Sequence, residues 1–326
     1  MLQLILLTSL ATQLPSGGPA SHEAMESLLI ELRRLMNEGQ VTEAAKSIPE
    51  ALRLAKGPKV DAIDAALLWN QAGLIHDSLG LFNLAEGEYR TGLRLLAGRT
   101  ASAAEALLLS NLAAVYLSVG GRPREAEMLS IRGLQVIEKL GGDRSPDRLI
   151  FLVALANVKI ELGDRLAARK LFFEVLESRD QSVNARLQRA AALSGLGAIA
   201  ESEHKFPDAI RFVLESITVF DEVYGTRHPD TIPLYLNLAF AYGKEHQWDR
   251  AEEVAGRGLE IAESRLSANG PLLAKALRAS AEAKRRLGKR AEGKDLEVRA
   301  RSLAGNSNGA AIRARVHVAD LRSAAK

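Results

Sequence analysis

The segment Gly80-Leu-Phe-Asn-Leu-Ala85 decides the fold, because related segments recur along the chain at a nearly constant distance. Each copy opens with glycine or histidine, and six of the seven close with alanine five residues later. Successive copies begin 41 or 42 residues apart, at Gly39, Gly80, Gly121, Gly163, His204, His246 and Gly288. Self-similarity with a period of this length is the mark of a repeat protein, in which each unit buries its apolar face against its neighbours.

The residues around each copy indicate two helices per repeat. An aliphatic residue follows the closing alanine by eight positions, at Leu52, Leu93, Leu134, Leu176, Ile217 and Leu259. The residue just before it is small in all of these copies except one, where it is Val175. Upstream, Leu112-Ala113 with Tyr116 and Leu238-Ala239 with Tyr242 lie on one face of a helix. We expect the small residues to let neighbouring helices approach closely.

This pattern resembles the tetratricopeptide repeat, and the longer period resembles the kinesin-light-chain-like branch of that family. The loop Gly225-Thr-Arg-His228-Pro229-Asp carries the second resemblance, since it matches the segment that ends the lengthened second helix in that branch. The resemblance covers about residues 22–304. It implies an all-α protein, a right-handed superhelical solenoid of antiparallel helix pairs with about seven repeats. Departures from the pattern are His204 and His246 for glycine, Gly293 for alanine, and Arg301 at an aliphatic position.

Composition and motifs argue against an enzyme. The chain has no cysteine, which excludes thiolate catalysis, disulfides and cysteine-based zinc sites. None of its six histidines has metal-ligand spacing, and His204, His228 and His246 are expected to be structural. The segment Gly195-Leu-Gly-Ala-Ile-Ala200 matches a dinucleotide fingerprint, but a helix-forming stretch precedes it instead of a strand. We therefore predict no catalytic residues, cofactor, metal or small-molecule substrate.

The first helices of the repeats carry the candidate binding residues. In the resembled family these helices line a groove, and the asparagine just before the Leu-Ala pair contacts bound peptide. Asn111 and Asn237 match that position, and Gln71 is a near equivalent. Amides can both donate to and accept from a peptide backbone, so the sequence predicts a scaffold for peptides or partner proteins. The alternative is that these amides complete hydrogen bonds between repeats. The predicted groove residues are Asn70, Gln71, Ser110, Asn111, Asn157, Ser194 and Asn237, with Phe240 among the apolar ones.

A basic C-terminal end gives the runner-up function. Residues 271–326 contain 14 Lys and Arg against 5 Asp and Glu. Such an excess attracts acidic proteins or nucleic acid, which would fit a regulatory or sensor subunit. Nucleic acid is the less favoured partner. The predicted contacts for an acidic partner are Lys275, Arg278, Arg285 and Arg286.

The two ends of the chain differ from the repeats. Residues 1–21 resemble a signal peptide, with an apolar run over Met1–Ala11 and small residues Gly18 and Ala20, but without the usual positive start. The run is too short to span a bilayer, so we predict no transmembrane span. We expect a secreted or periplasmic protein, with a cytoplasmic one as the alternative. Residues 305–326 are expected to form a flexible basic tail, and they carry a short apolar-polar alternation that could act as a docking peptide.

Overall fold

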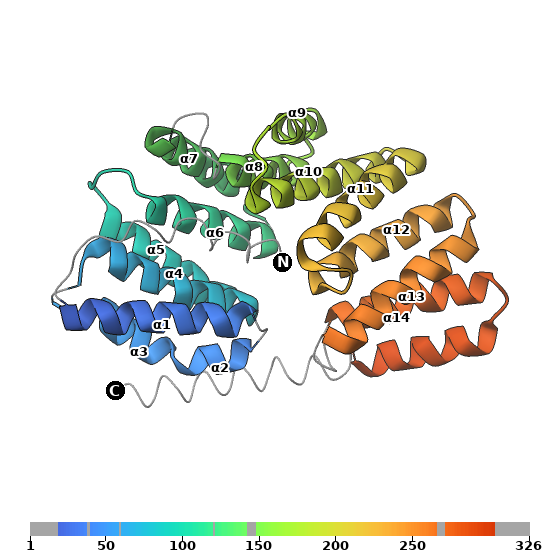
Figure 1. The fold of residues 1–326 in the computed structure, drawn as a ribbon, viewed down its shortest axis with the longest axis horizontal. Coiled ribbons are helices and arrows are strands. Elements are labelled where there is room, and N and C mark those ends of the chain that lie inside the picture. Colours follow the sequence, from blue (N-terminus) through green and yellow to red (C-terminus); the bar gives the residue numbers. More distant parts are fainter. Residues whose placement is uncertain are drawn as a thin grey trace. The chain divides into compact units, whose positions relative to one another are not determined.

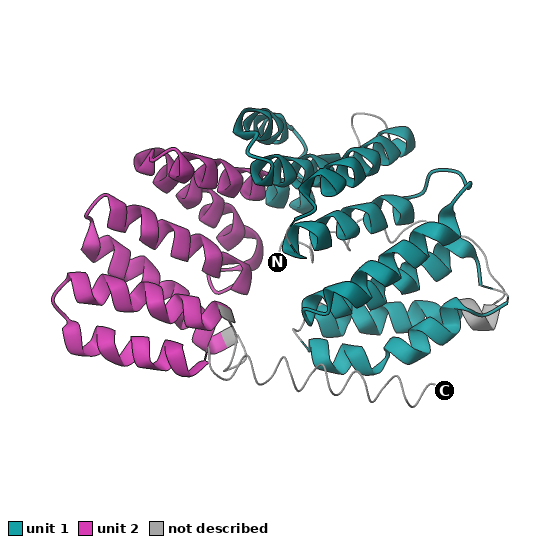
Figure 2. Ribbon diagram, turned by 180° about the vertical axis from the view of Figure 1, so that it is seen from behind, with its two compact units in different colours: residues 1–188 teal, residues 189–326 magenta. Residues whose placement is uncertain are grey.

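A computed structural model describes residues 19–37, 40–58, 60–119, 121–141, 148–265 and 271–303. All regular secondary structure assigned to these residues is helical, which confirms the all-α prediction. The chain divides into two compact units, residues 1–188 and 189–326, which are coloured separately in Figure 2. Most of the predicted leader and the whole predicted tail lie outside the described residues, although α1 already begins at Pro19.

Unit 1 is a stack of helix pairs joined by short turns (Figure 1). In the first pair the second helix is broken in two, because Pro49 at the start of the second piece cannot donate to the helix before it. The neighbouring pairs have unbroken second helices. The helices are α1 (Pro19–Asn37), α2 (Val41–Lys46), α3 (Ile48–Ala55), α4 (Ala62–Ser78), α5 (Phe82–Leu96), α6 (Ala103–Val119), α7 (Pro123–Gly141), α8 (Arg148–Glu161) and α9 (Arg165–Leu176).

Unit 2 continues the same alternation. Helix α10 (Val183–Ser202) begins just before the division between the units and pairs with α11. A short 3-10 turn, η4 (Pro229–Thr231), opens the next pair, and a helix over residues 290–303 closes the last pair. The other helices are α11 (Phe206–Tyr224), α12 (Ile232–Lys244), α13 (Trp248–Arg265) and α14 (Pro271–Arg286). The described residues thus contain seven helix pairs.

The recurring glycine or histidine ends the first helix of a pair in the left-handed conformation. Gly80, Gly163 and Gly288 have φ between 72° and 80°, and His204 and His246 take the same conformation at 59° and 57°. In all five turns the next N–H donates to the carbonyl five residues before it, as in Lys205 N to Ala200 O at 2.9 Å. This is the Schellman ending of a helix, which favours glycine at that position. The two histidine substitutions therefore preserve the turn.

The closing alanine and the small residue after it form the contacts between helices. The six alanines, from Ala44 to Ala251, are at most 1% exposed. A Cβ on Gly133 would lie 2.9 Å from the Phe151 ring on α8, and one on Gly92 would lie 2.9 Å from Leu108 on α6. The second helix of one repeat therefore touches the first helix of the next at a position where only a hydrogen fits, as the spacing predicted.

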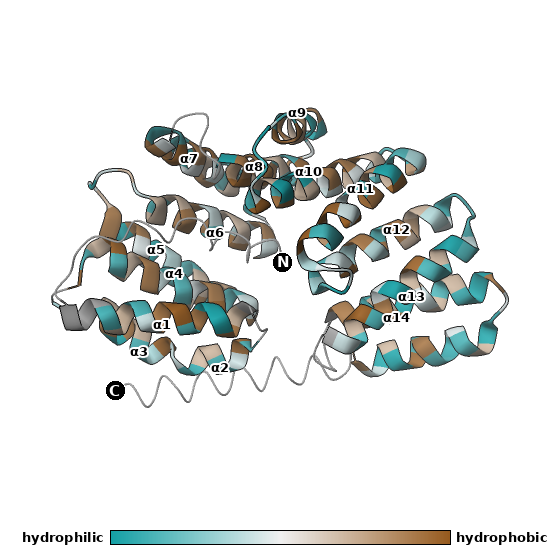
Figure 3. Ribbon diagram, viewed as in Figure 1, coloured by the Kyte–Doolittle hydropathy of each residue, from teal (hydrophilic) through white to brown (hydrophobic). Residues whose placement is uncertain are grey.

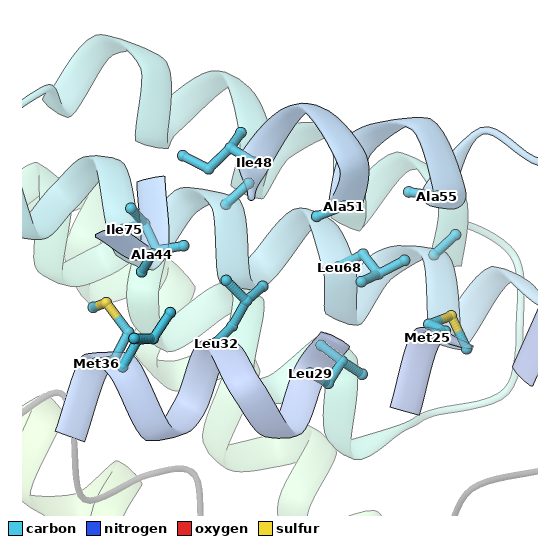
Figure 4. Close-up of a cluster of buried hydrophobic side chains, with 13 residues drawn as sticks. Met25, Leu29, Leu32, Met36, Ala44, Ile48, Ala51, Ala55, Leu68 and Ile75 are labelled. Atoms are coloured by element: carbon cyan, nitrogen blue, oxygen red, sulfur yellow. The ribbon is translucent and has the colours of Figure 1, made fainter. Parts of the chain in front are cut away.

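The core of the first repeats is continuous. Met25, Leu29, Leu32 and Met36 lie on one face of α1 and point toward Ile48 and the alanines of α2 and α3 (Figure 4). Leu68 and Ile75 of α4 complete the cluster. Burying this apolar face stabilises α1 far more than its helix propensity does.

First and second helices differ in their apolar pattern. Colouring by hydropathy shows the first helices α6 and α8 as largely apolar, whereas the second helix α7 carries more polar residues (Figure 3). Eleven of the 17 residues of α6 are buried, against five of the 19 in α7. Helix α6 contacts α4, α5, α7 and α8, so few of its side chains reach solvent. Side chains of the first helices that do reach solvent are candidates for binding.

Candidate binding surface

The first helices of neighbouring pairs lie against each other within each unit. In unit 1, α4 contacts α6 and α6 contacts α8, and in unit 2, α12 contacts α14. Residues in register on these helices therefore form rows that cross from one repeat to the next. The predicted binding residues belong to these rows.

In unit 1 the row of amides is buried. Asn111 on α6 donates from Nδ2 to Oδ1 of Asn70 on α4 at 2.8 Å, and both side chains are at most 2% exposed. Gln71 and Ser110 are also buried. The structure thus contains the inter-repeat hydrogen bond that was the alternative to a peptide contact. Peptide binding by these four residues stays a prediction.

Two acceptors in this row lack a donor. Asn111 Oδ1 and Gln71 Oε1 are buried and have no hydrogen-bond partner among the described residues. A buried unpaired acceptor costs about 1–3 kcal/mol, so a donor that reached either oxygen would be bound favourably. Both oxygens are enclosed by neighbouring atoms, however, so the surrounding side chains would have to move first.

In unit 2 the predicted binding residues of α12 are more exposed to solvent. Asn237 on α12 is half-buried, and Phe240, one turn later, is 47% exposed. The Nζ atom of Lys244 lies 5.0 Å from the centroid of the Phe240 ring, and the Phe206 ring meets it edge-on at 6.5 Å. Asn157 in unit 1 and Ser194 on α10 are also half-buried.

The exposed face of α14 carries the predicted basic residues. Lys275 and Arg278 are exposed, and neither forms an ion pair with a described residue. Arg285 and Arg286 both bind Glu282, Arg286 from Nε to Oε1 at 2.8 Å. The structure therefore separates the four predicted contacts into two that Glu282 neutralises in part and two without an ion pair to a described residue.

Residues that stand 42 positions apart occupy equivalent places on α12 and α14, so the two helices share one surface. Lys275, Arg278 and Glu282 stand 42 residues after Pro233, Leu236 and Phe240. Residues such as Leu238 and Leu277 face the opposite way and are buried. We call this surface the α12–α14 face, which comprises Leu236, Asn237, Phe240, Lys244, Lys275, Arg278, Glu282, Arg285 and Arg286.

Two acids on or beside this face have displaced pKa values. A hydrogen bond from Arg286, opposed in part by burial and joined by one from Arg285, holds the pKa of Glu282 below its usual value. Burial raises the pKa of Glu201 on α10, and the nearby Lys244 charge opposes that rise. Neither acid leaves the face negative, because the cations outnumber them.

Sequence reasoning missed Lys244 and Glu282 as members of the face. Glu282 stands three and four residues before Arg285 and Arg286, a spacing at which side chains on a helix form ion pairs. Lys244 stands four residues after Phe240 on the same helix. Both signals were present in the sequence.

The residues predicted to be structural have packing roles. Gly195, Gly197 and Ala200 lie inside α10, and a Cβ on Gly197 would lie 2.9 Å from Val213. The His228 ring stacks on Tyr224 with centroids 4.3 Å apart, and its Nδ1 accepts from the Asp230 N–H at 3.3 Å. Among the residues described, no group of three or more His, Asp or Glu side chains could hold a metal ion. No helix in the described ranges is long and apolar enough to cross a membrane.

Comparison with known protein families agrees with the geometry. Residues 188–264, which include α11, α12 and most of α10 and α13, match the tetratricopeptide repeat model. This segment of the chain consists of tetratricopeptide repeats. The match covers the helices from α10 to α13, and helix pairs of the same kind make up the rest of the described residues. No curated protein sequence matches the chain.

Several solved structures share the fold of this chain. BtubC (BKLC) from P. vanneervenii has a TM-score of 0.56 at 20% identity, covering 71% of this chain and 91% of its own. NprR in complex with its cognate peptide NprX has a TM-score of 0.60 at 15% identity, covering 92% and 88%. A Rap protein complexed with competence and sporulation factor has a TM-score of 0.54 at 14% identity, covering 87% and 98%. At these identities the likeness establishes a common fold.

Proposed function

We propose that this chain is a non-enzymatic scaffold that binds peptide segments or partner proteins on its first helices. The observation that carries the proposal is the exposed Phe240 beside half-buried Asn237 on α12. A large aromatic ring that is half open to water can bury apolar area when a partner arrives, and the neighbouring amide can pair with a peptide backbone. Together they offer affinity and orientation at one place.

The fold supports the same function. NprR and Rap are described in complexes with a cognate peptide and with competence and sporulation factor, respectively. Because this chain shares their fold and exposes polar and aromatic side chains on its first helices, peptide or protein binding is the role that its surface supports best. The absence of cysteine removes one class of catalytic nucleophile from the whole chain.

Affinity capture from a native extract tests the proposal. The wild-type chain, the Asn237→Ala/Phe240→Ala variant and a Phe173→Ala control would be compared, with the retained proteins identified by mass spectrometry. Phe173 is 44% exposed on the second helix α9, so its loss removes a similar exposed ring from a different surface. We expect the control to retain a partner that the double variant loses. Equal retention by all three proteins would contradict the proposal.

A further inference from the structure

Two basic residues of the α12–α14 face that form no ion pair with a described residue lie on one turn of α14. Lys275 and Arg278 are three residues apart, so their side chains project from the same side of the helix. Both are exposed and neither is paired with a described residue. Arg285 and Arg286, by contrast, share the carboxylate of Glu282. The basic residues at the two ends of α14 therefore differ in the net charge that they present to a ligand.

The neighbouring helix offers apolar area in the adjacent row. Leu236 is half-buried and Phe240 is 47% exposed, and they lie four residues apart on α12. Lys244 lies near the Phe240 ring and adds a third cation at the rim of this area. The face therefore combines an apolar centre with positive charge around it.

The corresponding rows in unit 1 have a different chemistry. Asn70, Gln71, Ser110 and Asn111 are neutral and buried there. The α12–α14 face thus places cations that have no ion pair to a described residue beside an exposed aromatic ring, which the four residues named in unit 1 do not.

From this charge and apolar pattern we infer that the α12–α14 face binds an acidic peptide segment that carries a large apolar side chain. The apolar side chain packs on Phe240 and Leu236, and carboxylates of the segment pair with Lys275 and Arg278. This inference rests on the proposed function, because it names the chemistry of the partner that the same first-helix surface would bind.

The geometry also sets a spacing within the segment. Axes of packed helices lie about 8–10 Å apart, so the cations of α14 are roughly 10 Å from the apolar centre on α12. An extended peptide advances about 3.3 Å per residue. An acidic residue about three positions from the apolar one would therefore reach Lys275 and Arg278 while the apolar side chain stays on Phe240.

Nucleic acid suits the face less well than an acidic peptide. Proteins that bind nucleic acid commonly neutralise about 6–10 phosphates, whereas this face has two unpaired cations on α14 and Lys244 on α12. Glu282 also places a carboxylate among the basic residues of α14, between Arg278 and Arg285. A short acidic segment needs few cations and gains the apolar contact.

Selection from a random peptide library displayed on phage tests the inference. The purified full chain would be compared with Lys275→Gln/Arg278→Gln, with Phe240→Ala, and with the control Arg290→Gln/Lys294→Gln. The control removes the same charge from exposed positions on the helix over residues 290–303. A random single-stranded oligonucleotide library would be offered in parallel. Circular dichroism would establish that each variant keeps its helical content.

We expect the wild type and the control to enrich peptides with an acidic residue about three positions from a large apolar one. For the best such peptide, Lys275→Gln/Arg278→Gln should weaken binding about two- to thirtyfold, as loss of two exposed ion pairs implies. The control should change the affinity less than about twofold. Binding by Lys275→Gln/Arg278→Gln should also depend less on salt.

Other outcomes would overturn the inference, and they separate it from the proposed function. Enrichment of neutral peptides that depends on Phe240 but not on Lys275 and Arg278 would contradict the inference of an acidic partner. It would still agree with the proposed scaffold function. Equal weakening by the control would show unspecific charge attraction, and preferential enrichment of oligonucleotides would show a nucleic-acid site. If the wild type enriches no peptide, the result contradicts both the inference and peptide recognition by this face.

Discussion

Asn111 on α6 donates a hydrogen bond to Asn70 on α4, 41 residues earlier, and neither side chain reaches solvent. The bond joins the first helices of two successive repeats. An amide that the sequence offers as a ligand contact therefore also holds the repeats in register. The two roles can be separated, because their loss has different consequences for stability and for binding.

Asn111→Ala should lower the free energy of unfolding by about 1–3 kcal/mol, because it leaves the buried Asn70 Oδ1 without its donor. Asn237→Ala should change it by less than about 0.5 kcal/mol, since Asn237 is only half-buried. Urea unfolding followed by circular dichroism measures both. Equal stability of the two variants would show that the bond between Asn111 and Asn70 contributes nothing.

Gly92→Ala and Gly87→Ala test the close approach between repeats on a single helix, α5. A Cβ at residue 92 would meet both methyl groups of Leu108 at 2.9 Å, whereas one at residue 87 would meet nothing within 4 Å. Gly92→Ala should therefore destabilise the protein by about 1–3 kcal/mol. Gly87→Ala should stabilise it by about 0.5–1 kcal/mol, because alanine favours the helix. Thermal and urea unfolding of both variants give the comparison, and a stabilising Gly92→Ala would contradict it.

Tyr116→Phe should cost about 1 kcal/mol, because the Tyr116 hydroxyl links two helices. It accepts from Arg90 Nη2 at 2.8 Å and donates to Glu86 Oε1 at 3.0 Å, while Arg122 lies over the ring. A double-mutant cycle with Glu86→Gln would isolate the coupling between Tyr116 and Glu86. Additive effects of the two substitutions would exclude such coupling.

Acid should weaken unit 1 through Glu86. Burial tends to raise the pKa of this carboxyl, but hydrogen bonds from Arg122 and Tyr116 outweigh it and hold the pKa below its usual value. A folded-state pKa below the unfolded one means that the stabilisation is present above the unfolded value of about 4.3. It is lost as the pH falls through the folded pKa.

Urea titrations of the wild type and Glu86→Gln at a series of acidic pH values test this expectation. The difference in stability between the two proteins should shrink as the pH falls below about 4.3. A difference that stays constant over that range would mean that the Glu86 carboxylate makes no net contribution.

The repeat residues were predictable because their roles are local. Ala85 and Gly92 are small at fixed distances from a turn, and closely packed helices require small side chains at such positions whatever the rest of the chain does. His204 and His246 were departures in the sequence, yet they take the same left-handed turn as glycine. Their place in the period therefore predicted the conformation better than their residue type did.

The burial and the pairing of the candidate binding residues were less predictable. The period puts Asn111 and Asn237 at equivalent places, but one is buried and the other half-buried. How deeply such an amide is buried depends on how closely the neighbouring first helices approach each other. That approach is set by side chains from several repeats together. The pairing of Asn111 with Asn70 was foreseeable in part, since the two stand one repeat apart. How Glu282 divides its charge between Arg285 and Arg286 depends on side-chain geometry that spacing alone does not give.

Photocrosslinking from residue 240 tests the central claim most directly. A benzoyl-phenylalanine would replace Phe240 in one protein and Phe173 in a matched one, and each would be irradiated in native extract and analysed by mass spectrometry. The account predicts a crosslink to a partner protein or peptide from position 240 and none to that partner from position 173. A partner that crosslinks only from position 173, or that is captured without any crosslink from position 240, would contradict binding at the α12–α14 face.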